Sequence, residues 1–394
     1  MAGVLDGIRV LDFGRYIAGP FCAALLGDLG ADVIRVEKVR GSEDRFIVPL
    51  TDTGDGAMFM QVNRNKRGLT LNPMKPDGRK VVRRLVATAD VVVANLPDSA
   101  LMAMGLDYRS LAALRPDVIL TSVSAFGAGG PLSGKLGFDG IGQAMSGSMY
   151  LSGRPGEPTK TYVPYVDFTT ALSATVGTLA ALMARQQTGR GQEVKGSLLA
   201  SALTIANTPL IEQAVNAPDR VATLNRSQVS APSDTHRTRD GWILVQTIGQ
   251  PLFERWTTLM GEPHWLEDPR FKDDMSRGDH GEVISERMAT WCAERTTEAA
   301  LSALEEARIP AGPVYSPQRT LDDAHVQVVR FLKAVPFPGS SRPVPIADTP
   351  FSLSETQTGI RHRAPLLGEH TDEVLGELGY APSEIAALRA TRVV

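Results

Sequence analysis

Short apolar runs alternate with helical patterns through the first two hundred residues. The runs at 8–12, 33–37, 91–93 and 118–124 are continuous and not alternating, which is typical of strands covered on both faces of a sheet. Helical stretches separate them, the first with Pro20 in its opening turn. Strands joined by helices predict right-handed βαβ units, so the pattern predicts an α/β fold with a parallel sheet.

The pattern changes in the second half of the chain. A long helix rich in small residues is predicted over 167–187, and a loose polar stretch from 213 to 231 is interpreted as a linker. A second unit begins with the apolar run 241–245, and the Pro-, Gly- and Ser-rich stretch 334–354 is interpreted as a linker back to the first unit. We therefore expect a large domain over 1–215, a small domain over 216–330, and a return linker with a C-terminal segment over 331–394.

Composition excludes several classes of protein. The chain has 394 residues, of which 43% are hydrophobic and 22% charged, as in globular proteins. Its 41 basic and 44 acidic residues give a net charge of −3, which offers no field to attract nucleic acid or an anionic membrane. Two cysteines cannot form a disulfide framework, and no secretory signal is visible at the start. We expect a cytoplasmic protein without nucleic-acid or membrane partners.

Two glycine-rich stretches only approximate phosphate-binding motifs. Residues 14–20 follow the first predicted strand and Glu37 ends the second, but the middle glycine of the dinucleotide fingerprint is missing. Residues 129–135 approximate a P-loop, but Leu136 stands where a hydroxyl must reach magnesium, and Pro131 lacks an N–H. The six histidines show no metal-ligand spacing. We expect neither a metal nor a tightly bound cofactor.

Asp167 stands at the entry to the predicted long helix and allows two interpretations. As an N-cap, it would accept a backbone N–H of the first helical turn. As a functional group, an aspartate with an ordinary pKa of about 3.9 is ionised at neutral pH and can act as a covalent nucleophile. The residues alone leave both interpretations open.

Short motifs spread over almost the whole chain resemble those of one enzyme family, the class III CoA-transferases of the CaiB/BaiF type. This family includes formyl-CoA transferase, carnitine CoA-transferase and α-methylacyl-CoA racemase. The resemblance implies a large Rossmann-like domain, a smaller α+β domain, and two chains interlocked as a homodimer. The motifs lie at 5–13, 30–37, 63–67, 95–97, 127–131, 137–139, 143–147, 188–192, 268–271, 309–314 and 364–372.

The resemblance places Asp167 at the family's catalytic aspartate. It implies that coenzyme A and acyl-CoA are substrates, and that CoA passes between an acyl-CoA donor and an organic acid. The implied intermediates are an acyl-aspartyl anhydride and an aspartyl-CoA thioester. Covalent intermediates of this kind divide one difficult exchange into several easier acyl transfers.

Further site residues follow from the same resemblance, position by position. Lys66 and Arg67 are equally compatible with a solvated turn. The positions matched to CoA contacts or basic candidates for its phosphates are Ala18, Lys38, Arg40, Lys66, Arg67, Leu71, Asn95, Leu96 and Met104. The positions matched to the substrate pocket are Phe138, Asp139 and Gly249.

Two departures from the family pattern bear on the reaction. Phe138 stands where the racemase branch has a histidine, and a phenyl ring cannot exchange the α-proton. The glycine-rich lid of formyl-CoA transferase is matched by 246–250, which contains one glycine. The sequence therefore favours CoA transfer, with an acyl-CoA racemase or isomerase and a non-catalytic acyl-CoA-binding protein as alternatives.

Overall fold

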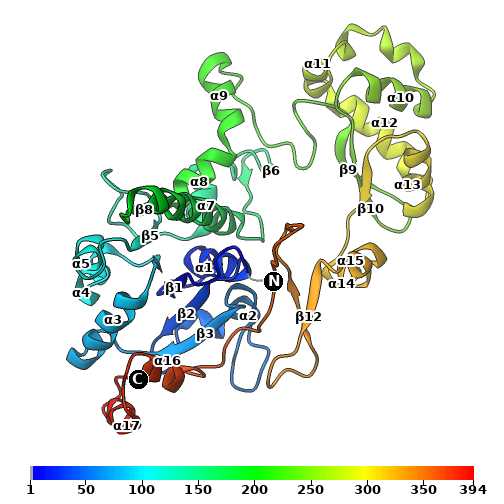
Figure 1. The fold of residues 1–394 in the computed structure, drawn as a ribbon. Coiled ribbons are helices and arrows are strands. Elements are labelled where there is room, and N and C mark those ends of the chain that lie inside the picture. Colours follow the sequence, from blue (N-terminus) through cyan, green and yellow to red (C-terminus); the bar gives the residue numbers. More distant parts are fainter. Residues whose placement is uncertain (1–2) are drawn as a thin grey trace. The chain divides into compact units, whose positions relative to one another are not determined.

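The computed structural model describes residues 3–394, which form two compact units (Figure 1). The first unit contains the residues up to Ser146, together with Tyr162–Pro209 and Val328–Val394. The second contains Gly147–Thr161 and Leu210–Gln327. Each unit has its own hydrophobic core, so each is described separately.

The first unit is built on a parallel sheet of six strands in the order β3-β2-β1-β4-β5-β8, which confirms the predicted α/β class. Its order reverses between β1 and β4, because the chain leaves β1 toward one edge and returns at β4 to build the other. In sheets of this kind ligands bind beyond the carboxyl ends of the strands at such a reversal. The strands are β1 (Arg9–Asp12), β2 (Asp32–Glu37), β3 (Lys66–Thr70), β4 (Val91–Ala94), β5 (Ile119–Ser124) and β8 (Glu193–Ser197).

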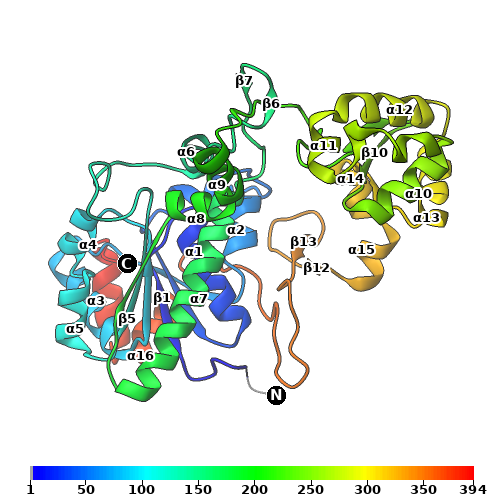
Figure 2. The ribbon, with the colours of Figure 1, turned by 90° about the horizontal axis from the view of Figure 1, so that it is seen from above.

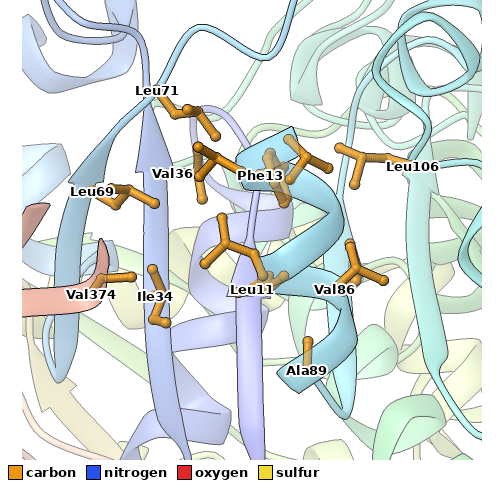
Figure 3. Close-up of a cluster of buried hydrophobic side chains, with 14 of the residues drawn as sticks. Leu11, Phe13, Ile34, Val36, Leu69, Leu71, Val86, Ala89, Leu106 and Val374 are labelled. Atoms are coloured by element: carbon orange, nitrogen blue, oxygen red, sulfur yellow. The ribbon is translucent and has the colours of Figure 1, made fainter. Parts of the chain in front are cut away.

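Helices cover both faces of this sheet (Figure 2). Neighbouring strand residues point to opposite cores: Val10 packs with one helix layer and Leu11 with the other (Figure 3). This double burial explains why the strands read as continuous apolar runs. One layer holds α1 (Ala18–Asp28), α7 (Tyr165–Thr188) and α8 (Leu198–Ile205); the other holds α3 (Pro76–Thr88), α4 (Asp98–Met104), α5 (Tyr108–Leu114), α16 (Thr371–Glu377) and α17 (Pro382–Ala390).

The stretch 334–354, expected as a linker, contains half of a β-hairpin. Strand β12 (Leu332–Val335) pairs antiparallel with β13 (Val344–Ala347), and the Pro, Gly and Ser residues form the connection between them. Val344 and Ile346 are buried against Phe59 of α2 (Ala57–Val62), so alternating apolar residues anchor the hairpin to the first unit. The Pro, Gly and Ser content predicted only a linker, and it concealed the two short strands.

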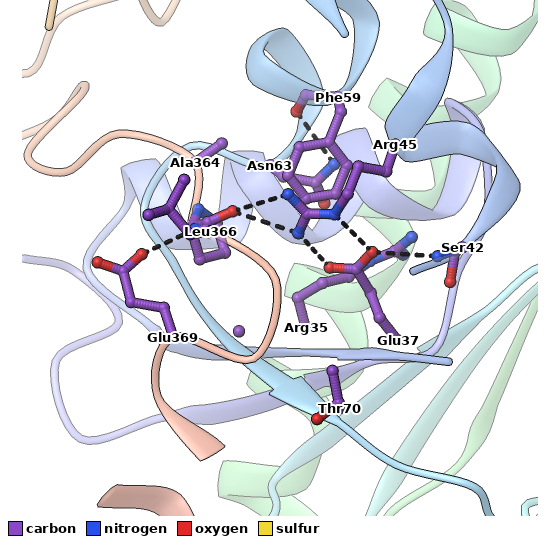
Figure 4. Close-up of polar contacts among 12 residues, drawn as sticks. Arg35, Glu37, Ser42, Arg45, Phe59, Asn63, Thr70, Ala364, Leu366 and Glu369 are labelled. Atoms are coloured by element: carbon purple, nitrogen blue, oxygen red, sulfur yellow. Dashed lines mark hydrogen bonds and ion pairs between the residues drawn. The ribbon is translucent and has the colours of Figure 1, made fainter. Parts of the chain in front are cut away.

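Buried ion pairs lie beneath the carboxyl ends of β1 and β2. Arg35 pairs with Asp12 and with Asp44, which lies in the 3-10 helix Glu43–Phe46. Arg45 donates to Glu37, to Asp55 and to the carbonyl of Pro365, which ties the C-terminal segment to this edge (Figure 4). Removing one partner from such a group leaves a charge buried without compensation.

The second unit has a three-stranded antiparallel sheet of β9 (Ser233–Arg237), β10 (Trp242–Gln246) and β11 (Ala311–Pro313). Its core is aromatic, with Phe253 stacked on Trp256 at 5.6 Å between ring centroids. Two further strands of two residues each, β6 (Gly153–Arg154) and β7 (Glu157–Pro158), pair antiparallel with one another. The helices are α10 (Gln250–Met260), α11 (Asp274–Asp279), α12 (Gly281–Ala293), α13 (Thr297–Glu306), α14 (Pro317–Asp322) and, in part, α9 (Asn207–Asn216) and α15 (Ala324–Val329), with 3-10 turns at Pro263–Leu266 and Pro269–Phe271.

Helix α7 has the length and composition of a membrane span. It is 24 residues long with a mean hydropathy of 1.3, and half of the apolar window is buried within the structure. A core helix has the same properties, so this is weak evidence for a membrane span.

Candidate active site

Asp167 is the third residue of α7, at the carboxyl edge of the sheet. The helix begins at Tyr165, so the N-cap interpretation of Asp167 is wrong; Pro164 occupies that position. Within residues 3–394, no hydrogen-bond donor reaches the carboxylate of Asp167, although the residue is half-buried. A carboxylate in this state is not engaged in holding the fold together and remains available to react.

The capping function belongs to Asp139, the first residue of α6 (Asp139–Met145). Its Oδ2 accepts hydrogen bonds from the backbone N–H of Val166, at 2.7 Å, and of Asp167, at 3.1 Å. Its Oδ1 accepts a hydrogen bond from the side chain of Gln143. Asp139 therefore satisfies the free N–H groups at the start of α7 from another helix, which brings two carboxylates together.

Burial raises the pKa of Asp167 to about 7, and the negative charge of Asp139 adds to this rise. The expectation of an ordinary pKa near 3.9 is therefore wrong. The helix N-terminus does not lower the pKa because Asp139 already occupies its N–H groups. Raised pKa values of this kind are typical of catalytic carboxyl groups.

Two aromatic pairs lie beside these carboxylates. Phe168, next to Asp167, packs edge-on against Phe21 of α1, with ring centroids 4.9 Å apart. Phe138, next to Asp139, packs edge-on against Tyr16 at 5.3 Å, and 60% of Phe138 remains exposed. The rings provide a largely apolar surface around the Asp139 and Asp167 segments.

The loop after β1 is tied to the loop after β4 across the reversal of strand order. The amide oxygen of Asn95 accepts from the backbone N–H of Arg15 at 2.6 Å, and its NH₂ donates to the carbonyl of Arg15 at 2.7 Å. Tyr16 follows with a φ of 60°, a left-handed conformation that is strained for a tyrosine. Such strain persists only where the surroundings impose it, and it is frequent at functional sites.

The other residues matched to CoA contacts divide by location. Ala18, Lys38 and Leu71 follow the carboxyl ends of β1, β2 and β3, and Leu96 follows β4, so they share the edge at which α7 begins. Lys38 is exposed and pairs with Glu43, and Arg40 is exposed nearby. Met104 ends α4 and packs on the core beside that helix.

Lys66 and Arg67 do not join this group. The ammonium of Lys66 is buried and donates to Asp12, to Asn63 and to the carbonyl of Pro20, which leaves none of its three protons for a phosphate. Arg67 lies near the amino end of β3, on the opposite edge, where it pairs with Asp32 and with two glutamates of α16. Both are engaged in the fold and neither forms a solvated turn.

Gly249 belongs to the second unit and lies at the start of α10. Its φ of 86° is a conformation that glycine adopts without strain. Its N–H donates to both carboxylate oxygens of Asp274, at 3.0 and 2.8 Å, and Asp274 also pairs with Arg277. The turn is therefore held by a side chain of the same unit.

The roles of Asp139, Arg15 and Tyr16 were not recognised from the sequence. Asp139 was assigned to the pocket only by resemblance, and its bonds to α7 span about 28 residues of chain. Nothing in the spacing of Asp139 and Asp167 signals the contact, because a long loop separates their helices. Across residues 3–394 no group of three or more His, Cys, Asp or Glu side chains is arranged to hold a metal ion.

A parallel sheet covered on both faces, with a half-buried carboxylate of raised pKa at its carboxyl edge, is typical of an α/β enzyme. The chain belongs to the CoA-transferase family III, which it matches over residues 5–371. It is therefore a CoA-transferase, an enzyme that acts on CoA thioesters.

Relatives and solved structures agree over nearly the full length. The chain is 32% identical to the succinyl-CoA–D-citramalate CoA-transferase of Chloroflexus aurantiacus, over 99% of this chain and 98% of the relative. It is 31% identical to the succinate–glutarate CoA-transferase of Agrobacterium fabrum, over 95% of each. A crystal structure of a CaiB/BaiF family protein from Brucella suis superposes with a TM-score of 0.84 at 30% identity, over 96% of this chain and all of that one.

Proposed function

We propose that this enzyme moves CoA from an acyl-CoA donor to an organic acid through covalent intermediates on Asp167. The observation that carries the proposal is the half-buried carboxylate of Asp167, which accepts no hydrogen bond and whose pKa is raised to about 7. A carboxylate engaged only in capping or ion pairing would be held by donors and would have a lowered pKa.

The proposed reaction begins when the ionised carboxylate of Asp167 attacks the carbonyl carbon of the donor thioester. The C–S bond breaks, which yields an acyl-aspartyl anhydride and CoA thiolate. The thiolate then attacks the aspartyl carbonyl, and the donor acid leaves as its carboxylate. Asp167 now carries CoA as a thioester, an activated intermediate from which CoA is not lost.

The acceptor acid completes the exchange. Its carboxylate attacks the aspartyl thioester, which forms a second mixed anhydride and releases the thiolate again. The thiolate attacks the acceptor's carbonyl carbon, so that the new acyl-CoA forms and the Asp167 carboxylate is regenerated. No net proton transfer is needed, and only the ionised form of Asp167 begins the cycle.

We propose that CoA lies along the carboxyl edge of the first sheet, over the loops after β1 and β4. Lys38 and Arg40 are exposed cations on this edge and would meet the phosphates. Lys66 and Arg67 are omitted because other side chains occupy them. The apolar and polar contacts proposed along the edge are Ala18, Leu71, Asn95, Leu96 and Met104.

Phe138 and Asp139 would shape the acyl pocket, and Gly249, which the resemblance also matches to this pocket, belongs to the second unit. Phe138 pairs with a tyrosine ring and has no titratable group, which favours transfer over α-proton exchange. Because the relatives named above act on succinyl-CoA, succinate, D-citramalate or glutarate, we propose succinyl-CoA as the donor and a small dicarboxylic acid as the acceptor.

We also propose that two chains form an interlocked homodimer in the cytoplasm. Large apolar side chains remain exposed on α7 and, separately, on α9, and exposed apolar surface is frequent at interfaces between chains. Both cysteines are buried and unpaired, as in a reducing compartment. The exposed apolar residues are Leu172, Val176, Met183, Ile211 and Val215.

The test is to incubate the enzyme with succinyl-CoA and to locate covalent CoA by mass spectrometry of the intact chain and its peptides. We expect one CoA on the peptide that contains Asp167, and none in the Asp167→Asn variant, which should fold but not transfer CoA. Glu298→Gln, which changes an exposed carboxylate in the first turn of α13, is the matched control and should retain activity. Transfer by Asp167→Asn at the wild-type rate would refute the proposal.

A further inference from the structure

A basic pocket lies beside the β12–β13 hairpin of the first unit. It has a volume of about 570 Å³, within the range of small-molecule sites. Five basic side chains line it: Arg330, Lys333, Arg361, His362 and Arg363. All of them belong to the segment after Val328, away from the strand ends at which Asp167 lies.

Positive charge in this pocket is only partly neutralised. Lys333 pairs with Asp348 at 2.7 Å, and Arg363 pairs with Glu369. Arg361 donates to the carbonyl of Gly27 at 2.7 Å. Among the described residues, no carboxylate lies within ion-pair distance of Arg330 or Arg361. Four permanent cations against two carboxylates leave an excess of two positive charges.

The backbone that carries these cations is held in place before any ligand binds. The side-chain oxygen of Asn65 accepts from the N–H groups of Arg361, at 2.7 Å, and His362, at 2.9 Å. The N–H of Asn65 donates back to the carbonyl of His362 at 3.0 Å. A site whose cations are already ordered binds an anion with less loss of conformational entropy.

Arg330 has a strained backbone, and the pocket has an apolar wall. The φ of Arg330 is 59°, a left-handed conformation that is unfavourable for a residue with a side chain. Val335 and Ile360 line the same pocket and pack against the core beneath the hairpin. The pocket thus combines two guanidinium groups that lack a carboxylate partner with apolar side chains on its wall.

We propose that this basic pocket binds a phosphate-bearing anion of nucleotide size, at a site separate from Asp167. Guanidinium groups match phosphate oxygens with paired, charge-assisted hydrogen bonds. The apolar wall would take the base. Free nucleotides and the nucleotide end of CoA share this chemistry, so the experiment must distinguish these two sources.

The test uses isothermal titration of the full chain with ADP, with CoA and with inorganic phosphate. Arg330→Gly removes one cation and relieves the left-handed strain, so it should not lower the melting temperature. Arg361→Gln removes the second cation. Arg342→Ala, an exposed arginine in the β12–β13 connection, is the control. We expect both pocket variants to weaken ADP binding about tenfold and the control to leave it unchanged.

The stoichiometry identifies the source. Two equivalents of CoA per wild-type chain, reduced to one in Arg330→Gly, would assign the pocket to the nucleotide end of CoA. One equivalent of CoA, with ADP still binding to the CoA-saturated chain, would assign it to a free nucleotide. Either result supports the proposal, and unchanged turnover in Arg330→Gly would separate the pocket from the active site.

Three outcomes would overturn the proposal. ADP binding of equal strength in wild type and Arg330→Gly would place the nucleotide elsewhere. Inorganic phosphate as tightly bound as ADP would reduce the pocket to a small-anion site. A change of oligomeric state in Arg330→Gly, with no ADP binding to the wild type, would show that another copy of the chain covers the pocket. None of these outcomes bears on the covalent role of Asp167.

Discussion

Asp139→Asn isolates the electrostatic contribution of one carboxylate to the reactivity of another. The substitution keeps the size of the side chain and one oxygen that can accept from the start of α7, but removes the negative charge. Asp139 is the smaller of the two causes that raise the pKa of Asp167 from 3.8 to about 7, burial being the larger. Its removal should therefore lower that pKa by less than half of the difference, to about 6.

The assay is the pH dependence of kcat/KM, which reports the pKa of the essential group in the free enzyme. With succinyl-CoA and glutarate as substrates, we expect activity to rise through about pH 7 in the wild type, because only ionised Asp167 attacks. In Asp139→Asn the same rise should occur about one pH unit lower. Weaker capping of α7 should cost about 1 kcal/mol of stability.

Glu298→Gln serves as the control, because it removes a carboxylate from the first turn of another helix, in the second unit. A merely structural role for Asp139 would lower activity at every pH and leave the midpoint in place. An unchanged or raised midpoint in Asp139→Asn would refute the reasoning that its charge raises the pKa of Asp167.

Three further substitutions test the site and its support. The raised pKa of Asp167 means that the folded state binds a proton on this group more tightly than the unfolded state does. The group's contribution to stability is therefore present below about pH 4 and is lost as the pH rises through 7. In thermal melts, Asp167→Asn should be more stable than the wild type by about 2 kcal/mol at pH 8, and equally stable at pH 4. Tyr16→Gly should be about 1 kcal/mol more stable to urea than Tyr16→Ala, because both variants lose the contact with Phe138 but only glycine relieves the left-handed φ. Equal stabilities of the two variants would contradict the inference that the backbone is strained at Tyr16. Arg45→Met should cost about 3–5 kcal/mol because it leaves buried carboxylates unpaired. Lys80→Met at an exposed pair should leave the stability to urea nearly unchanged, and a similar loss in both variants would show that burial does not set the cost.

Local sequence determined the sheet and the position of Asp167 near the start of a long helix. Continuous apolar runs such as 91–93 predict doubly covered strands because successive residues must be buried on opposite faces. The small-residue pattern after Asp167 predicts the long helix to within two residues of the observed start. These features depend on neighbours in the chain, so periodicity is sufficient to find them.

Tertiary structure alone decided which charges are free. Lys66 and Arg67 are adjacent in sequence and were both candidates for a phosphate, yet one is buried against Asp12 and the other lies on the opposite edge of the sheet. The cap on α7 comes from Asp139 in another helix, and the charge of Asp139 adds to the burial that raises the pKa of Asp167. A side chain's protonation and availability depend on groups brought together by folding across long stretches of chain, and no local pattern records those distances.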